Sequence, residues 1–370
     1  MIRILHTADL HLDKEFFPED PKFSALRTKE QRALFANIMM YARDKKVDVL
    51  IFAGDLLDKA LPSEETGKLL IREFENTPDT EIFIVPGRSD PYRPGCFYAT
   101  ARFPSNVHIF TEERIAEYYV ERLDTAVYGF AFTRRNMPHN PFAVMPPVNK
   151  ERFNLLCAYG SLEGEESCCP IKIDEIEHSG VDYLALGHGH AASDLLKAGK
   201  TYYAAAGSPE GLDFDEPGQK GARIVVAEKN EQGELLLESK KVRFSRRAFE
   251  RVTLDATGLS DCLPLVDALD AEMKRIGADG DTILEAVITG EVPMTFRLKS
   301  EAFGRLSEKL CRLTLTDKTL MLCGSEENEG DLKSVISRKT AEKTPDPRLR
   351  SEILKTAFGI LENEKSRGGR

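Results

Sequence analysis

Four short groups of acidic and histidine residues recur along the chain. They are Asp9-Leu10-His11, Gly54-Asp55-Leu56-Leu57-Asp58, Gly87-Arg88-Ser89-Asp90 and Gly187-His188-Gly189-His190. Carboxylates and imidazoles are ligands for Mn, Fe and Zn. A carboxylate such as that of Asp55 can bridge two ions about 3.5–4 Å apart, the separation that clamps both oxygens of an in-line phosphoryl displacement. A single group of this kind would be a weak signal, but the four in order predict a metal centre.

Short apolar runs precede most of these groups and are the elements expected to position them. The runs cover residues 2–5, 47–53, 82–85, 155–158 and 183–186. Each is short, rich in Val, Ile and Leu, and bounded by turn residues, which is typical of a buried strand. Residues 25–44 and 66–75 have the apolar spacing of amphipathic crossover helices. The alternation predicts an α/β fold in which polar residues past the strand ends meet at one edge of the sheet.

The character of the sequence changes near residue 246. Before it, residues 221–244 predict a hairpin whose turn lies around Gln232 and Gly233. After it, a strand at 252–254, a helix at 263–276, a strand at 283–289, a helix at 301–310 and a strand at 319–322 suggest a small α/β domain. We predict a first domain over 1–245, a second over 246–324, a polar linker over 325–346 and an amphipathic helix over 347–370.

The terminal helix is predicted from a cap and an apolar stripe. Asp346 can cap it, and Pro347 suits its first position. The stripe consists of Leu349, Ile353, Leu354, Ala357, Phe358 and Leu361. Such a face either docks a partner or packs on its own domain.

The composition limits the functions and the cellular compartment that can be expected for this chain. The net charge of −10 over 370 residues does not favour a general nucleic-acid binder. The densest basic run is Lys240, Lys241, Arg243, Arg246, Arg247 and Arg251. It is either a solvated strand edge or a local phosphate-binding cluster. Seven cysteines, an odd number, predict a reducing cytoplasm rather than a disulfide framework. We expect neither a signal peptide nor a membrane helix of about 20 apolar residues.

Longer phrases around the four groups carry a family resemblance. They are ILHTADLHLD, VDVLIFAGDLLD, YLALGHGH, GSPEGLDFDEPGQKG and VITGEVPM. Over roughly residues 1–325 the chain resembles the calcineurin-like metallophosphoesterases, in particular DNA-repair exonucleases of the SbcD and YhaO type. The resemblance implies a metallophosphoesterase β-sandwich flanked by helices, with residues 246–324 as a small α/β capping domain followed by the C-terminal helix.

The resemblance also implies the ligands of two metal ions. The first ion would be held by Asp9, His11, Asp55 and His190, all present here. The second would be held by Asp55, His188, an asparagine and a histidine that follows a middle strand. Arg88 stands at the asparagine position, and a guanidinium has no lone pair to offer a cation.

Two further positions depart from the family pattern. Ser89 stands where the family has the histidine thought to assist the leaving group, and Tyr159 stands at the middle-strand histidine. A phenolate can bind a metal, but a tyrosine with a pKa near ~10 is mostly protonated at neutral pH. We therefore expect one Mn²⁺, or Fe or Zn, rather than two ions. Arg88 could still contact a phosphate, and Ser89 is the other candidate at the catalytic position.

Three functions remain open at this point. The first is a DNA-repair exonuclease-like phosphoesterase whose hydrolysis of phosphodiester bonds in DNA is weak or lost. The second is a non-catalytic scaffold that binds nucleic acid or a partner, and the third is a one-metal small-molecule phosphodiesterase. The resemblance implies DNA and a coiled-coil ATPase of the SMC type as partners, and a homodimer is a further alternative.

The remaining candidate residues are assigned supporting roles. His6 is expected to pack or to support the site rather than to bind the ion. Asp58 and Asp90 are expected to orient ligands and loops. His108, His139 and His178 match no motif and are expected to be structural or on the surface.

Overall fold

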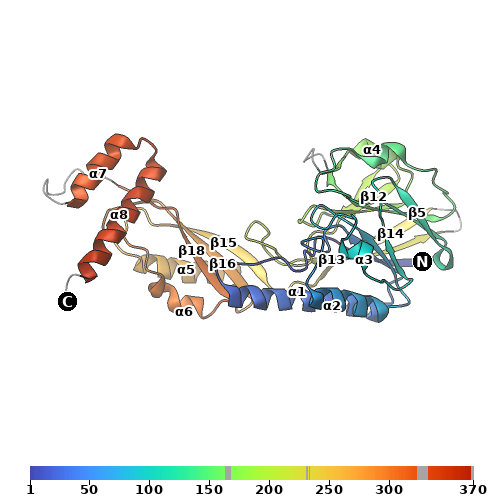
Figure 1. The fold of residues 1–370 in the computed structure, drawn as a ribbon, viewed down its shortest axis with the longest axis horizontal. Helices are drawn as coiled ribbons and strands as arrows, with labels where there is room; N and C mark the ends of the chain where they lie inside the picture. Colours follow the sequence, from blue (N-terminus) through green and yellow to red (C-terminus); the bar gives the residue numbers. More distant parts are fainter. Residues whose placement is uncertain (163–167, 231, 233, 323–331, 368–370) are drawn as a thin grey trace. The chain divides into compact units, whose positions relative to one another are not determined.

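The computed structural model describes residues 1–162, 168–230, 232, 234–322 and 332–367 (Figure 1). The chain divides into two units, Met1–Arg246 and Arg247–Arg370. Among the described residues, no helix is both long enough and apolar enough to cross a membrane.

The first unit is built on two six-stranded sheets. One sheet runs in the order β14 (Leu235–Arg243), β13 (Gly221–Lys229), β1 (Ile2–Thr7), β2 (Val49–Ala53), β3 (Glu81–Val85) and β4 (Val107–Ile109). The other runs in the order β11 (Leu196–Ala198), β12 (Thr201–Ala205), β10 (Tyr183–Gly187), β7 (Phe153–Tyr159), β6 (Thr125–Gly129) and β5 (Ala116–Val120). The five runs predicted as strands form β1, β2, β3, β7 and β10, and β13 pairs antiparallel with β14 as predicted for the hairpin.

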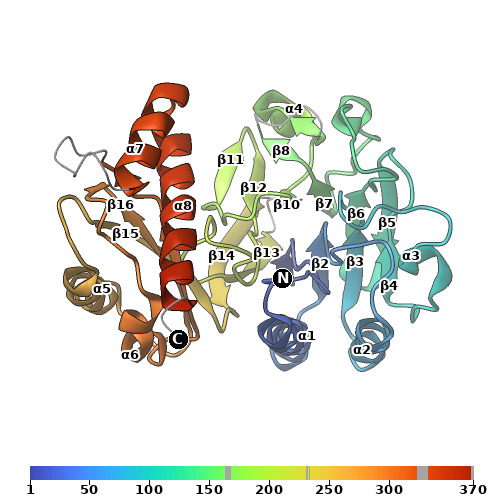
Figure 2. The same cartoon turned by 60° about the vertical axis from the view of Figure 1, so that its left-hand side comes forward.

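Alternating side chains of β1 and β2 build two different cores. Ile4 and Ile51 join the apolar core that also holds Leu155 and Leu184 of the second sheet. Leu5 and Phe52 point the other way, into a core shared with residues of α1 and α2. In Figure 2, α1 and α2 lie on one side of strands β1 to β3 and the second sheet lies on the other. Burial on both faces explains why these strands read as continuous apolar runs.

The two long helices of this unit begin at side-chain caps. The elements are α1 (Pro21–Asp44), α2 (Glu64–Glu75), α3 (Phe97–Thr100) and α4 (Ile173–His178), with short 3-10 helices at Glu121–Leu123 and Pro141–Val144 and a small strand pair of β8 (Ser161–Leu162) and β9 (Pro170–Ile171). The Asp20 side chain accepts a hydrogen bond from the Phe23 N–H, and the Ser63 side chain accepts one from the Thr66 N–H. Both long helices therefore start earlier than the apolar spacing alone predicted.

The second unit contains a three-stranded parallel sheet. Its elements are β15 (Ala248–Asp255), α5 (Leu263–Ile276), β16 (Thr282–Thr289), β17 (Glu291–Val292), a 3-10 helix at Ser300–Phe303, α6 (Gly304–Ser307), β18 (Arg312–Asp317), β19 (Leu320–Met321), α7 (Leu332–Lys343) and α8 (Pro347–Arg367). The helix predicted over 301–310 is replaced by the 3-10 helix and the single turn of α6. Strand β18 was not predicted, although its alternating RLTLTD sequence is a strand signal.

The predicted linker over 325–346 lies partly outside the described residues, since these omit 323–331. Its described part contains α7, so the range holds a helix where the sequence suggested only a polar connection. The following helix, α8, begins at Pro347 as predicted. Its apolar stripe is divided, because Leu354 and Phe358 are fully buried whereas Leu349 and Ile353 are exposed.

Candidate metal centre

The predicted metal-binding residues lie at the carboxyl ends of strands. Asp9 and His11 follow β1, Asp55 follows β2, and His188 and His190 follow β10. Asp9, His11, Asp55 and His188 have φ values of 52°, 46°, 45° and 81°, in the left-handed region. This region is unfavourable for residues with a Cβ, and each instance costs about 1–3 kcal/mol that the surrounding structure must supply.

Two glycines allow the strand ends to approach one another. Gly54 has φ of +100°, and a Cβ there would lie 1.9 Å from the Tyr159 ring. A Cβ on Gly187 would lie 1.6 Å from the carbonyl oxygen of Ala53. Larger residues at either position would displace the side chains that surround the site.

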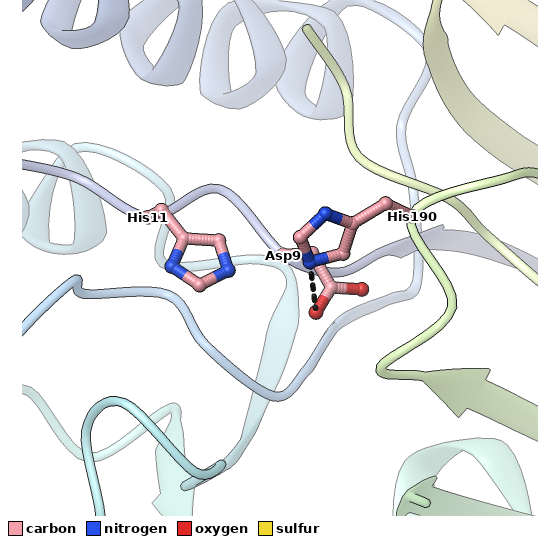
Figure 3. Close-up of side chains that lie close together, drawn as sticks. All are labelled: Asp9, His11 and His190. Atoms are coloured by element: carbon pink, nitrogen blue, oxygen red, sulfur yellow. Dashed lines mark ion pairs between the residues drawn. The ribbon is translucent and has the colours of Figure 1, made fainter. Parts of the chain in front are cut away.

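Three side chains form a cluster that can hold a metal ion. Asp9, His11 and His190 offer ligand atoms that all lie within 4.8 Å of one another. Figure 3 shows them turned toward a common space, with His190 Nε2 3.8 Å from Asp9 Oδ1. Asp9 Oδ1 and His11 Nε2 are buried and have no hydrogen-bond partner among the residues that the structure describes. Since buried polar atoms are normally paired, these two atoms fit a bound cation.

Carboxylates behind the two histidines fix their orientation. His11 Nδ1 lies 3.0 Å from Asp58 Oδ1, and His190 Nδ1 lies 2.5 Å from Glu216 Oε1. A carboxylate that accepts from Nδ1–H leaves Nε2 available to the metal. Asp58 thus orients His11, one of the predicted ligands. Glu216 was missed, although it lies in the GSPEGLDFDEPGQKG phrase that carried the family resemblance.

The electrostatics of the cluster favour a positive charge. Burial raises the pKa of Asp9 to about 7, against the lowering effect of His190. Burial lowers the pKa of His190, but the hydrogen bond to Glu216 and nearby carboxylates outweigh it and the net pKa is raised. The pKa of His11 is also raised, because the hydrogen bond to Asp58 and the surrounding carboxylates outweigh burial. Burial raises the pKa of a carboxyl group, and neighbouring carboxylates raise the pKa of an imidazole. Raised pKa values of both kinds therefore indicate that the cluster lacks a positive charge.

Asp55 lies beside the cluster and is held by three donors. Its Oδ2 is 3.5 Å from His11 Nε2. Its Oδ1 accepts from the Ser89 N–H at 2.8 Å, and its Oδ2 accepts from Ser89 Oγ at 3.1 Å and from the Tyr159 hydroxyl at 2.7 Å. The side of Asp55 that faces Ser89 and Tyr159 is therefore bonded to protein groups.

Tyr159 is a hydrogen-bond donor in this arrangement. Burial raises its pKa well above the usual value, and the charges of Asp55 and Asp9 raise it further, so the phenol stays protonated. Its hydroxyl also lies 3.2 Å from His188 Nδ1. The backbone N–H of His188 donates to Asp9 Oδ2 at 3.1 Å, so His188 contacts both the cluster and Tyr159.

The loop after β3 is held by a buried carboxylate. Asp90 accepts from the backbone N–H groups of Gly87 and Leu57 at 2.7 and 3.0 Å and from the Tyr98 hydroxyl at 2.5 Å. Burial raises the pKa of Asp90 to about 7. Asp90 orients this loop, as predicted, and thereby places Ser89 on Asp55.

The other histidines lie away from the cluster. His6 joins the two sheets, with Nδ1 2.9 Å from the Tyr183 hydroxyl and Nε2 3.1 Å from the Leu186 carbonyl oxygen. His108 pairs with Glu81, His139 pairs with Glu113, and His178 contacts the carbonyl oxygen of Asp174. These contacts agree with the packing and structural roles predicted for them.

The basic run is divided, because Lys241 and Arg243 line a cavity together with His190, whereas other members form ion pairs elsewhere. Lys240, Lys241 and Arg243 belong to β14. Arg247 pairs with Asp281, and Arg251 pairs with Glu285. The run is thus divided between a strand and separate ion pairs.

Comparison with known proteins identifies a family and several relatives that the sequence of this chain matches. The family model described as "Calcineurin-like phosphoesterase" matches residues 2–192. The chain is 26% identical over 307 residues to "Uncharacterized metallophosphoesterase YhaO" of Bacillus subtilis, covering 79% of this chain and 72% of that protein. It is 24% identical over 321 residues to "DNA double-strand break repair protein Mre11" of Saccharolobus solfataricus, covering 79% and 76%. It is 23% identical over 261 residues to the SbcD component of the nuclease SbcCD of Staphylococcus epidermidis, covering 62% and 67%.

Proposed function

Because the chain belongs to the calcineurin-like phosphoesterase family, with YhaO, Mre11 and SbcD proteins as relatives, we propose that it acts on phosphodiester bonds of DNA with weakened hydrolysis. The observation that carries the proposal is the metal-binding cluster, in which Asp9 Oδ1 and His11 Nε2 are buried and converge with His190. The names of two relatives, a DNA double-strand break repair protein and a component of a nuclease, support DNA as the substrate.

The ion would be held by Asp9, His11 and His190, with Asp55 adjacent. Nitrogen and oxygen ligands of this kind suit Mn²⁺, Fe or Zn, and we propose Mn²⁺. A bound ion of this class polarises a phosphoryl oxygen and lowers the pKa of a coordinated water. The chain itself supplies Asp58 and Glu216, which hold the two imidazoles so that their Nε2 atoms face the ion.

A single tightly bound ion is supported by the contacts of Asp55. Ser89 and Tyr159 donate to its carboxylate, on the side where the family pattern implies a second ion. The Arg88 guanidinium adds a fixed positive charge on the same loop and cannot ligate. Ser89 also provides no imidazole to protonate a leaving oxygen, and general acid assistance is typically worth about 10²–10⁴-fold. Weakened hydrolysis follows from both losses.

Metal titration of the purified chain tests this proposal. We expect one equivalent of Mn²⁺ to bind tightly and His190→Ala to weaken that binding by more than about tenfold. His178→Ala, which changes an exposed histidine, is the matched control and should bind like the parent. Two equivalents of similar affinity would contradict the single-ion proposal. DNA cleavage as fast as that of the Staphylococcus epidermidis nuclease subunit under the same conditions would contradict weakened hydrolysis.

One observation favours a second function as a partner-binding protein. Helix α8 exposes Leu349, Ile353 and Ile360, which are 49%, 38% and 56% exposed. Apolar side chains on one exposed helix suit a helix-in-groove contact. The name of the SbcD relative, a component of a larger nuclease, agrees with such a role. We propose a coiled-coil ATPase of the SMC type as the partner.

The domain division and location are part of the same proposal. Residues 1–245 would form the phosphoesterase domain, and residues 246–324 would form a capping domain. Six described cysteines are free thiols, which is compatible with the cytoplasmic location that the sequence predicts.

A further inference from the structure

A basic cavity adjoins the metal centre in the first unit. It has a volume of about 460 Å³. Its cationic lining residues are Lys59, Arg88, Arg93, Arg134 and Arg135. They come from the segments that follow β2, β3 and β6, so the topology gathers them from three distant parts of the chain.

The positive charge of the cavity exceeds its negative charge. Asp58 is the carboxylate among the lining residues, and it is already bonded to His11. Arg134 is compensated by Glu113 at 3.1 Å. Within the described part of the chain, no ion pair joins Lys59, Arg93 or Arg135 to a carboxylate. In a protein of net charge −10, this local excess of cations favours an anion over a dication.

Two residues that line the cavity also contact residues of the metal centre. Ser89 lines it and donates to Asp55, and Asp58 lines it and holds His11. An anion bound here would therefore lie next to the metal centre. Guanidinium groups bind phosphate oxygens in a bidentate manner, whereas they cannot bind a metal ion. Small-ligand sites have volumes of roughly 300–1,000 Å³, so the space suits one nucleotide rather than a duplex.

We propose that this cavity binds the phosphate group of a nucleotide, either free or at the end of a DNA strand. The inference rests on the proposed function for the nature of the substrate, but the binding itself needs no metal ion. Arg93 and Arg135 supply the charge that attracts the phosphate. Arg88 lines the same cavity and directly precedes Ser89, which contacts Asp55. A phosphate in this cavity would therefore lie next to Ser89 and Asp58, which contact residues of the metal centre.

The test measures binding of deoxyadenosine 5′-monophosphate by calorimetry in the presence of EDTA. We expect the parent to bind and the double variant Arg93→Gln/Arg135→Gln to bind at least about tenfold more weakly, a change of about 1.4 kcal/mol. The matched control, Arg102→Gln/Arg114→Gln, removes two arginines of the same unit outside the cavity and should bind like the parent. Thermal unfolding of each variant checks that both remain folded.

Oligonucleotides then distinguish the two sources of the phosphate. If a 5′-phosphorylated strand competes with the nucleotide and the same strand with a 5′-hydroxyl does not, the strand end is the ligand. Competition by neither strand assigns the free nucleotide. A parent that fails to bind the nucleotide, or a double variant that binds as tightly as the control, overturns the inference. Those results leave the metal titration unaffected, so failure of the cavity and failure of the proposed function remain distinguishable.

Discussion

At the scale of single residues, two of the three departures from the family pattern act on one carboxylate. Ser89 and Tyr159 donate three hydrogen bonds to Asp55, and Arg88 belongs to the same loop as Ser89. A carboxylate offers about four lone-pair sites, so three donors leave little capacity for a second ion. The substitutions therefore all disfavour a second metal ion beside Asp55.

Rebuilding the family pattern should restore hydrolysis. The triple change Arg88→Asn, Ser89→His and Tyr159→His frees Asp55, supplies metal ligands and supplies a proton donor. We expect Mn²⁺-dependent DNA cleavage to rise by about 10²–10⁴-fold. Each single change should have little effect, because the second ion site then stays incomplete. Cleavage rates are measured at equal occupancy of the first ion.

The parent and a neutral variant provide the comparison. His178→Gln changes an exposed histidine outside the metal centre and the basic cavity and should leave the cleavage rate near that of the parent. A triple variant that binds the ion and folds but cleaves no faster than the parent would show that Arg88, Ser89 and Tyr159 do not limit hydrolysis.

His6 should make the stability of the first unit sensitive to acid. Burial, together with the charge of Arg223, lowers the pKa of His6 to about 3. In the unfolded chain His6 binds a proton below about pH 6.5, whereas in the folded chain it stays neutral until the pH falls to about 3. Stability is therefore fully present above pH 6.5 and falls as the pH drops from 6.5 toward about 3, by up to about 1.4 kcal/mol per pH unit.

Chemical unfolding at several pH values checks this expectation. His6→Gln should flatten the decline between pH 6.5 and 3, although the loss of the Tyr183 and Leu186 contacts lowers stability at neutral pH. His178→Gln, at an exposed position, should keep the slope of the parent. An unchanged slope in His6→Gln would show that His6 is protonated in the folded chain.

At the scale of elements, α8 combines a buried and an exposed face. Leu354 and Phe358 are fully buried and pack with Met294 and Met321, whereas Leu349 and Ile353 are exposed. Deletion of the whole helix would therefore remove core contacts together with any partner surface. Point substitutions can separate the two roles.

Phe358→Ala should lower the unfolding free energy of the second unit by about 3–5 kcal/mol, because it leaves a cavity in the core. The double variant Leu349→Glu/Ile353→Glu should leave that free energy nearly unchanged and abolish copurification with the proposed coiled-coil ATPase. Leu263→Glu, an exposed leucine of α5, is the matched control for the added charge. Copurification that survives the double variant would show that the partner binds elsewhere.

At the scale of the whole molecule, each apolar core belongs to one unit. The two cores of the first unit draw their members from residues up to 244, and the two cores of the second unit begin at residue 252. The metal-binding cluster and the carboxylates that orient it also lie within Met1–Arg246. A chain of residues 1–246 should therefore fold alone.

We expect this shortened chain to bind one Mn²⁺ with an affinity within a few-fold of that of the full chain. Calorimetric titration and thermal unfolding measure the two properties. The same shortened chain carrying His190→Ala should lose the binding, which shows that the site is the same one. An insoluble or unfolded product would contradict the independence of the first unit.

The sequence alone determined the strands and predicted the three side chains that converge as a candidate metal site. The apolar runs ending in Asp, His or Gly predicted β1, β2, β3, β7 and β10, because strand burial depends on local periodicity and turn residues. The motif order predicted which side chains would follow them. Helix starts were less well predicted, since they depend on caps such as Asp20 and Ser63 rather than on apolar spacing.

Tertiary structure decided which of these residues touch. Tyr159 donates to Asp55 across 104 positions of sequence, and Glu216 reaches His190 from outside every strand that was predicted. The basic cavity likewise exists only because the segments that follow β2 and β3 of one sheet meet the segment that follows β6 of the other. Local patterns encode the elements and include the glycines that let the strand ends approach. The contacts themselves depend on the order of the strands and on how the two sheets pack, which no local pattern contains.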